Sequence, residues 1–146
     1  MPRKSYHVSK ALKEMNRKRP NPKVAFRHLE KAAEKNDYEA LYAIATWHLF
    51  GYYLKKDTKK AVVYLKKATL GNYADAFYDL AICYEEGVGT KINLAQAFEC
   101  YLKAFLHGDK QSMYEIGRCY YYGIGVRKNI KVGSIWLEHA RQIGVS

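Results

Sequence analysis

Apolar and polar residues repeat along this chain with a period of 36 residues. The clearest copy is residues 93–104, NLAQAFECYLKA, and related copies begin at Asn21, Asp57 and Asn129. In each copy the apolar positions recur at the spacing of one helix face, and an Asn or Asp precedes them as an N-cap. Four copies in register predict a repeat protein in which every copy contributes an amphipathic helix. The last three of these helices are expected to end near Asn72, Gly108 and Gly144.

Another helix is predicted ahead of each copy. In the last three repeats it spans residues 37–50, 73–86 and 109–122, and a glycine follows each span: Gly51, Gly87 and Gly123. Glycine adopts the left-handed conformation that closes a helix at little cost. The first repeat is less regular, with a helix over about residues 5–17 and Pro22 at the first position of the next helix.

The loops between the predicted helices are short, so neighbouring helices run antiparallel. We therefore predict an all-α solenoid of four 36-residue helix–turn–helix repeats. The repeats account for nearly all of the 146 residues, which predicts a single domain over residues 1–146, with repeats at about 3–36, 37–72, 73–108 and 109–144. A solenoid of this size buries its core between neighbouring repeats.

Equivalent positions separate the predicted core from the surface. Two columns hold small residues that let helices approach closely: Ala32, Ala68, Ala104 and Ala140 in one, and Ala25, Ala61, Ala97 and Gly133 in the other. One face of the first helices forms the expected core: Ala40, Ile44, Trp47 and His48, then Ala76, Leu80, Cys83 and Tyr84, then Ser112, Ile116, Cys119 and Tyr120.

The third repeat carries the pattern Ala76-x3-Leu80-Ala81-x2-Tyr84-x2-Gly87-x-Gly89, followed by Asn93, Ala97, Tyr101 and Lys103-Ala104. This pattern resembles the Sel1-like repeat, a relative of the tetratricopeptide repeat, and the fourth repeat shares it. Three positions depart from it: His48 replaces a tyrosine, Tyr53 replaces the second glycine, and Gly133 replaces an alanine. The resemblance implies a right-handed α-solenoid (an α–α superhelix) that scaffolds or binds other proteins, with no catalytic residue among the matched positions.

In solenoids of this family the first helices line a concave groove, so the face opposite the core is the expected binding surface. Its candidate partner-binding residues are Tyr42, Thr46, Phe50, Tyr78, Asp79, Ile82, Tyr114, Glu115, Arg118 and Tyr122. Aromatic residues and Arg are common interface anchors. The tyrosine column at 42, 78 and 114 is explained equally well by packing. Glu115 and Arg118 differ between repeats without an evident packing reason, as Asp79 and Ile82 do, and are the better candidates for specificity.

The net charge of +11 is unevenly distributed. Residues 1–36 carry +8, residues 37–72 carry +3, residues 73–108 carry −3 and residues 109–146 carry +3. A basic end predicts a partner selected by charge, and an acidic protein fits best. Arg17, Lys18 and Arg19 are the candidate residues for electrostatic steering.

No pattern of reactive residues points to catalysis, a cofactor or a metal site. The five histidines and three cysteines lack metal-ligand spacing, and the Gly-x-Gly pairs follow helices instead of strands. Cys83, Cys100 and Cys119 lie in apolar helical patterns, which predicts free, buried thiols in a cytoplasmic protein. No apolar run reaches 18 residues and the N-terminal residues lack the apolar stretch of a secretion signal, so we expect neither a membrane span nor secretion.

The sequence thus predicts a non-enzymatic protein–protein interaction module. One alternative is an immunity or inhibitor protein that neutralises a bacterial toxin, a use that several bacterial members of the resembled family suggest. A second is a nucleic-acid-binding protein acting through the basic first repeat. Against this second alternative, the basic residues occupy turns and helix backs without interleaved aromatic residues, and the acidic third repeat would interrupt a continuous track.

Overall fold

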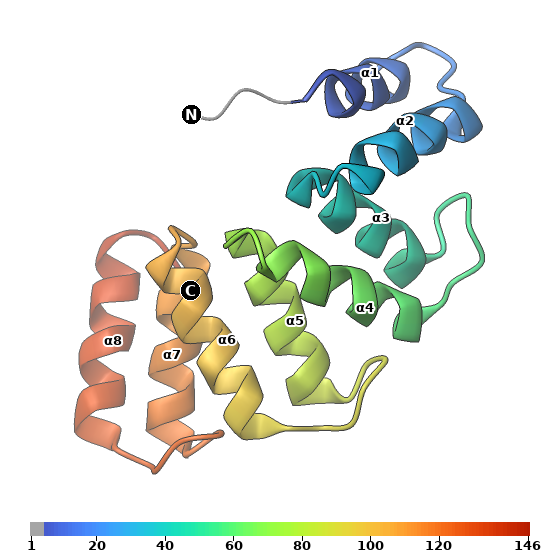
Figure 1. Cartoon of the computed structure of the whole chain (residues 1–146). Coiled ribbons are helices and arrows are strands. Elements are labelled where there is room, and N and C mark those ends of the chain that lie inside the picture. The colour runs from blue at the N-terminus through green and yellow to red at the C-terminus, as the bar shows by residue number, and fades with distance from the viewer. Residues whose placement is uncertain (1–4) are drawn as a thin grey trace. The chain divides into compact units, whose positions relative to one another are not determined.

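The computed structural model describes residues 5–146, and the regular structure in that range is entirely α-helical (Figure 1). The eight described helices are α1 (Tyr6–Met15), α2 (Pro22–Glu34), α3 (Tyr38–Phe50), α4 (Thr58–Thr69), α5 (Ala74–Glu86), α6 (Leu94–Leu106), α7 (Gln111–Tyr122) and α8 (Ile130–Gln142). The all-α class and the four helix–turn–helix pairs are confirmed. The expected start of the first repeat, at residue 3, lies outside the described residues.

Side-chain caps explain where the second helix of each repeat begins. The Oδ1 atoms of Asn21, Asp57, Asn93 and Asn129 accept hydrogen bonds from backbone N–H groups of the first helical turn. The bond from the Gln96 N–H to Asn93, for example, is 3.1 Å long. Each cap satisfies a donor that the helix itself leaves unpaired. The predicted starts are therefore confirmed, whereas α4, α6 and α8 end two or three residues earlier than expected.

Glycine closes the first helices of the last three repeats, as predicted. Gly51, Gly87 and Gly123 have φ of 69°, 75° and 71° and sit in the left-handed region. Two residues further on, Gly89 and Gly125 also have φ of 69°, and Tyr53 adopts φ of 60° in the equivalent place. The backbone of the second repeat thus keeps the shape of its relatives although it lacks their second glycine.

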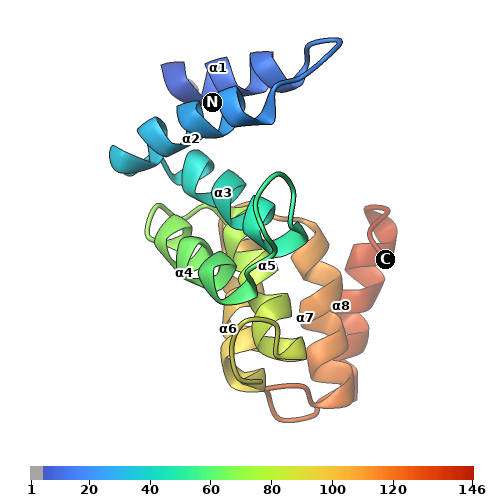
Figure 2. The ribbon, with the colours of Figure 1, turned by 90° about the vertical axis from the view of Figure 1, so that its right-hand side faces the viewer.

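The helices belong to two compact units, unit 1 up to Gly71 with α1–α4, and unit 2 (Asn72–Ser146) with α5–α8. Within each unit the helices pack in sequence order, α1 on α2 and α3 on α4, then α5 on α6 and α7 on α8 (Figures 1 and 2). The two pairs of a unit are joined by packing of α2 on α3 and of α6 on α7. The single domain expected from the sequence and the handedness of the solenoid stay predictions.

Small residues line the helix contacts, as the two columns predicted. Every alanine of both columns is at most 2% exposed. Gly133, the exception in the second column, is buried, and a Cβ added to it would lie 2.6 Å from the backbone nitrogen of Tyr121 and 2.8 Å from the Gly117 oxygen. Helix α8 therefore approaches α7 more closely than an alanine would allow.

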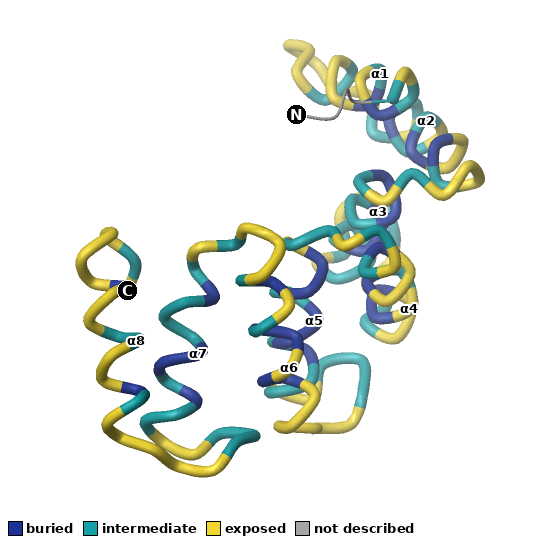
Figure 3. Tube along the Cα trace, turned by 60° about the vertical axis from the view of Figure 1, so that its left-hand side comes forward, coloured by how far each residue is buried: buried dark blue, intermediate teal, exposed yellow. Residues whose placement is uncertain are grey.

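The predicted core face of the first helices is largely confirmed. Ala40, Ile44 and their equivalents in α5 and α7 are buried, as are Cys83 and Cys119. Trp47, His48, Tyr84 and Tyr120 are only partly buried, since their large rings reach the helix ends. A second buried side was missed, formed by Leu41, Ala45, Phe77, Ala81 and Gly117. Figure 3 shows dark blue residues recurring along these helices, while most of α8 is exposed.

Among residues 5–146, no helix combines the length and the apolar character needed to cross a membrane.

Candidate protein-binding face

The ten candidate partner-binding residues divide between the two units. Tyr42, Thr46 and Phe50 lie on α3 of unit 1, and the other seven lie on α5 and α7 of unit 2. We name these seven residues, Tyr78, Asp79, Ile82, Tyr114, Glu115, Arg118 and Tyr122, the α5–α7 face. All of them are at least partly exposed.

Four side chains join α5 to α7 in one polar network. The Arg118 Nη2 donates to both carboxylate oxygens of Glu85, at 2.6 and 2.8 Å, and its Nε donates to Glu115 Oε2 at 2.8 Å. The hydroxyl of Tyr78 donates to the other oxygen of Glu115, at 3.3 Å. The structure therefore brings together three residues that the sequence nominated, Tyr78, Glu115 and Arg118, and adds Glu85.

The network is half-buried, and this strengthens it. The side chains of Arg118, Glu85 and Glu115 are 25%, 19% and 14% exposed. Ion pairs screened from water in this way interact more strongly than fully exposed pairs, and the bonds from Nη2 to Glu85 and from Nε to Glu115 restrict the rotation of the guanidinium group. The polar centre of the α5–α7 face is therefore held in a defined arrangement.

The titration behaviour of the network reflects its partners. Burial alone would lower the pKa of Arg118, but the hydrogen bonds that it donates to Glu85 and Glu115 outweigh this effect and raise the pKa above its ordinary value. Burial, together with the charge of Glu115, raises the pKa of Tyr78 to about 12. Tyr78 and Arg118 therefore each keep one charge state throughout the neutral pH range.

Glu115 and Arg118 correct one expectation from the sequence. They were nominated because no packing reason explained their variation between repeats, and the network gives them a structural role. Glu85 was missed altogether. A signal existed, because Glu85 is a charged residue at a position where repeats two and four carry Leu49 and Tyr121.

Tyr78, one of the three residues of the tyrosine column at 42, 78 and 114, also has a packing role. The ring of Tyr78 meets the buried ring of Tyr101 edge to face, with centroids 5.8 Å apart. Tyr42 and Tyr114 are likewise half-buried. The tyrosines at these positions therefore both pack and remain accessible to a partner.

Two of the α3 candidates, Thr46 and Phe50, have surroundings of a different kind. The hydroxyl of Thr46 donates to the Ala43 carbonyl of the same helix, at 2.7 Å. Phe50, at the end of α3, is 76% exposed. Of the three steering candidates, all exposed, Arg17 pairs with Glu14 at 3.0 Å, whereas none of the described residues forms an ion pair with Lys18 or Arg19.

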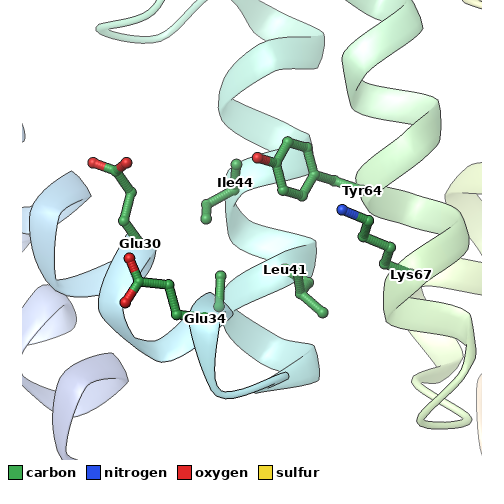
Figure 4. Close-up of a pocket in the computed structure, with 7 residues that line it drawn as sticks. Glu30, Glu34, Leu41, Ile44, Tyr64 and Lys67 are labelled. Carbon is green, nitrogen blue, oxygen red and sulfur yellow. The ribbon is translucent and has the colours of Figure 1, made fainter.

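A hollow that the sequence did not predict lies between α2, α3 and α4 of unit 1 (Figure 4). Its volume is about 220 Å³. Glu30 and Glu34 stand on one side, Leu41 and Ile44 lie behind, and Tyr64 and Lys67 stand on the other side. The Lys67 amine lies 5.3 Å from the centre of the Tyr64 ring. The hollow therefore has an acidic wall, formed by Glu30 and Glu34, and a basic wall that carries Lys67.

The three thiols are buried and unpaired, as predicted. Burial raises the pKa of Cys83 and of Cys100 to about 11 and that of Cys119 to about 12. A protonated, buried thiol is a poor nucleophile and a poor metal ligand. Among residues 5–146, no three His, Cys, Asp or Glu side chains are grouped so that they could hold a metal ion.

A comparison with protein families matches the Sel1 repeat to four stretches of the chain, residues 16–37, 39–73, 74–109 and 110–141. The chain belongs to the Sel1 repeat family. The resemblance seen in the sequence is thereby confirmed. The SLR fold of this family is generally a protein-interaction scaffold. A comparison with curated proteins gave no match.

Three solved structures are similar to this Sel1 repeat chain. The c5321 protein, a protective antigen of uropathogenic Escherichia coli strains that displays an SLR fold, matches 94% of the chain with a TM-score of 0.89 and 23% identity. A Sel1 repeat protein from Oxalobacter formigenes matches 80% of it (TM-score 0.71, 28% identity), and Helicobacter pylori cysteine rich protein B matches 73% (TM-score 0.67, 27% identity). The matched regions cover 30%, 87% and 86% of those chains, so this chain spans less than a third of c5321.

Proposed function

We propose that this Sel1 repeat protein is a non-enzymatic module that binds another protein through its α5–α7 face. The observation that carries the proposal is the network of Tyr78, Glu85, Glu115 and Arg118. It presents aromatic and charged groups in a fixed arrangement, which lowers the entropy lost when a partner binds. The partly exposed Ile82 and the exposed Tyr122 supply apolar area beside it.

The non-enzymatic part of the proposal is supported by the state of the potential nucleophiles. All three thiols are buried and hold their protons. Free thiols also favour a reducing compartment, and we propose the cytoplasm.

We further propose that the partner carries acidic charge. Arg17, Lys18 and Arg19 would then raise its association rate, because steering by exposed charges acts over about 10 Å at 0.1 M salt without requiring contact.

The test is capture of a partner by the tagged full chain at physiological salt, followed by dissociation rates. Ile82→Asp and, separately, Tyr122→Ala should speed release, because the loss of an interface anchor costs about 2 kcal/mol or more, roughly a 30-fold change. Ile135→Asp is the control, since Ile135 is an isoleucine at the surface of another helix, α8, where it is 52% exposed. A partner that leaves all three variants at the wild-type rate does not bind this face.

A further inference from the structure

Four aromatic rings from three segments pack together in unit 1, where α3 ends. Phe26 of α2 stacks on Trp47 of α3 with ring centres 5.6 Å apart, and Tyr52 and Tyr53 of the α3–α4 loop meet Trp47 edge-on at 4.9 and 6.2 Å. Phe26 and Tyr53 are 5.9 Å apart. Tyr52 and Tyr53 remain 42% and 46% exposed. The cluster therefore has a packed base and two rings at the surface.

The backbone of Tyr53 adopts a strained conformation within this aromatic cluster. Its φ of 60° lies in the region that glycine occupies at the equivalent positions Gly89 and Gly125. A bulky residue rarely adopts this conformation, and strain of this kind concentrates at functional sites. Neither equivalent loop of unit 2 has rings here, since Val88-Gly89 and Ile124-Gly125 take the places of the two tyrosines.

Basic residues lie near the two exposed rings, both in the same loop and in the turn that follows α1. The hydroxyl of Tyr52 lies 3.9 Å from the sulfur of Met15, the last residue of α1, and the exposed Arg17, Lys18 and Arg19 follow in the next turn. Figure 1 shows the α1–α2 turn and the α3–α4 loop at the same end of unit 1. Lys55 and Lys56, also exposed, follow the tyrosines in that loop.

Acidic residues balance this charge only in part. Arg17 pairs with Glu14, but residues 18–27 contain four further Lys or Arg and no Asp or Glu, and residues 51–60 contain four Lys and one acid, Asp57. The Asp57 carboxylate is engaged as the N-cap of α4, where it accepts a hydrogen bond from the Lys60 N–H. Folding therefore brings exposed rings and unbalanced cations together, although they are about 33 residues apart in the sequence.

We propose that this turn surface, formed by Tyr52 and Tyr53 with the basic residues of the α1–α2 turn and the α3–α4 loop, binds single-stranded nucleic acid. Unpaired bases stack on the tyrosine rings, and the lysines and arginines contact phosphates. In the sequence, the lack of aromatic residues interleaved with the basic ones counted against nucleic acid. The fold removes that objection, because it brings Tyr52 and Tyr53 close to the basic turn that follows α1. The proposal does not rest on protein binding by the α5–α7 face.

A nucleic acid fits this surface better than an acidic protein does. Protein partners anchor through large side chains that fill desolvated apolar pockets. The hollow of about 360 Å³ lined by His48, Leu54, Lys55, Lys56, Asp57 and Lys60 has four charged residues among these six, three of them basic. Exposed rings with cations nearby suit base stacking and phosphate contacts.

The rings are tested by fluorescence anisotropy with the full chain and a labelled oligothymidine of about 20 nucleotides in 0.1 M NaCl. We expect tighter binding to this probe than to a duplex or a poly-glutamate peptide of the same length. The double variant Tyr52→Ala/Tyr53→Gly should weaken oligothymidine binding about tenfold or more and leave duplex binding unchanged, because only unpaired bases stack. Glycine suits the left-handed φ at position 53, so Tyr53→Gly alone gives the same test if the double variant does not fold.

The charges are tested by the salt dependence of the same binding. Lys55→Gln/Lys56→Gln should reduce the slope of log affinity against log salt by about 1.4, at roughly 0.7 per lost phosphate contact. Arg127→Gln/Lys128→Gln is the matched control, since these two residues occupy the equivalent positions in the fourth repeat, and it should leave the slope unchanged. The proposal is overturned if the ring variants bind oligothymidine as wild type does, if both charge pairs act equally, or if poly-glutamate binds as tightly as oligothymidine.

Discussion

Units 1 and 2 are built from the same repeat and use charged residues in different ways. Residues 1–71 carry 17 Lys or Arg against 6 Asp or Glu, whereas residues 72–146 carry 8 of each. The ion pair of Arg17 in unit 1 joins an arginine side chain that is 64% exposed to Glu14, which is 11% exposed, whereas Arg118 in unit 2 is 25% exposed and bonds two carboxylates. The cations of unit 1 therefore lie mostly at the surface, and unit 2 uses part of its charge to hold α5 and α7 together.

The loops after the first helices differ in a related way. A Cβ added to Gly125 in unit 2 would lie 1.9 Å from the Leu94 carbonyl oxygen, so this loop packs directly on the start of α6. In unit 1 the equivalent residue is Tyr53, whose ring contacts Phe26 and Trp47. The same backbone shape serves close packing in one unit and the display of a side chain in the other.

The largest effect is expected from Gly133→Ala, which tests how tightly unit 2 is packed. Helix propensity alone would predict a gain of about 1 kcal/mol. The added methyl group would collide with the backbone of α7 at Tyr121 and Gly117, and overpacking against backbone costs more than this gain. We expect a net loss of about 2–3 kcal/mol in the free energy of unfolding, measured in urea.

Ser134→Ala is the control for that experiment, because Ser134 is the next residue of α8 and is exposed. It should stabilise by a few tenths of a kcal/mol through helix propensity alone. A Gly133→Ala protein as stable as the Ser134→Ala protein would show that α7 and α8 can separate freely.

Arg118→Met should have the second-largest effect, about 2 kcal/mol. The substitution leaves Glu85 and Glu115 half-buried without their cation, and breaking a buried ion pair costs more than breaking an exposed one. The loss should appear as a lower free energy of unfolding in urea at neutral pH.

Arg17→Met is the matched substitution in unit 1 and should change the free energy of unfolding less, because Arg17 is itself 64% exposed and Glu14, 11% exposed, keeps the hydrogen bond that it accepts from the Asn21 N–H. The triple variant Arg118→Met/Glu85→Gln/Glu115→Gln should recover part of the loss. Equal losses of unfolding free energy in Arg17→Met and Arg118→Met would show that the ion pairs of the two units contribute equally to stability.

The smallest expected effect is a loss of stability at acidic pH caused by His48 of unit 1. Burial, assisted by Lys60 and opposed by Asp57, lowers the pKa of His48 below its ordinary value near 6.5. The folded state therefore favours neutral His48, and the stability that this residue contributes is complete above about pH 6.5 and is lost as the pH falls toward the lower folded value. Urea unfolding at pH 7.5 and pH 5 should show a loss for wild type.

His48→Tyr restores the residue found at the equivalent positions, Tyr84 and Tyr120, and should reduce that loss. The part that remains is assigned to His28, whose pKa is also lowered, by burial and by His7 and Lys31. An unchanged loss in the His48→Tyr protein would mean that His48 does not contribute.

The sequence was sufficient for most of the fold because the signals that set it are local. An N-cap such as Asn93 and a closing glycine such as Gly87 act within one helical turn, and the 36-residue period shows which positions are equivalent. The small-residue column predicted a close approach at Gly133, but the contact with the backbone of α7 could not be predicted, because it also depends on a second glycine, Gly117, in that helix.

The candidate sites were predicted less well because they depend on contacts between distant residues. Arg118 was nominated for partner specificity, which stays a prediction, and its bond to Glu85 was missed because it joins residues 33 apart. Tyr52 and Tyr53 were not nominated as ligand-binding residues, since only folding places Tyr52 against Met15, two residues before the basic turn that starts at Arg17. Periodicity identifies what the repeats share and contains no information on pairings unique to one unit.

The placement of the thiols gives the molecule a built-in reporter. Cys83, Cys100 and Cys119 all lie in unit 2, each is buried, and unit 1 has no cysteine. A thiol reagent added to the native protein can therefore react only when part of unit 2 opens, and its labelling rate measures the opening free energy of that unit. Trp47 lies in unit 1, so fluorescence of a Trp136→Phe variant would follow the other unit in the same sample. Thiol labelling would then report the opening of unit 2, and tryptophan fluorescence the opening of unit 1, without any label being engineered into the chain.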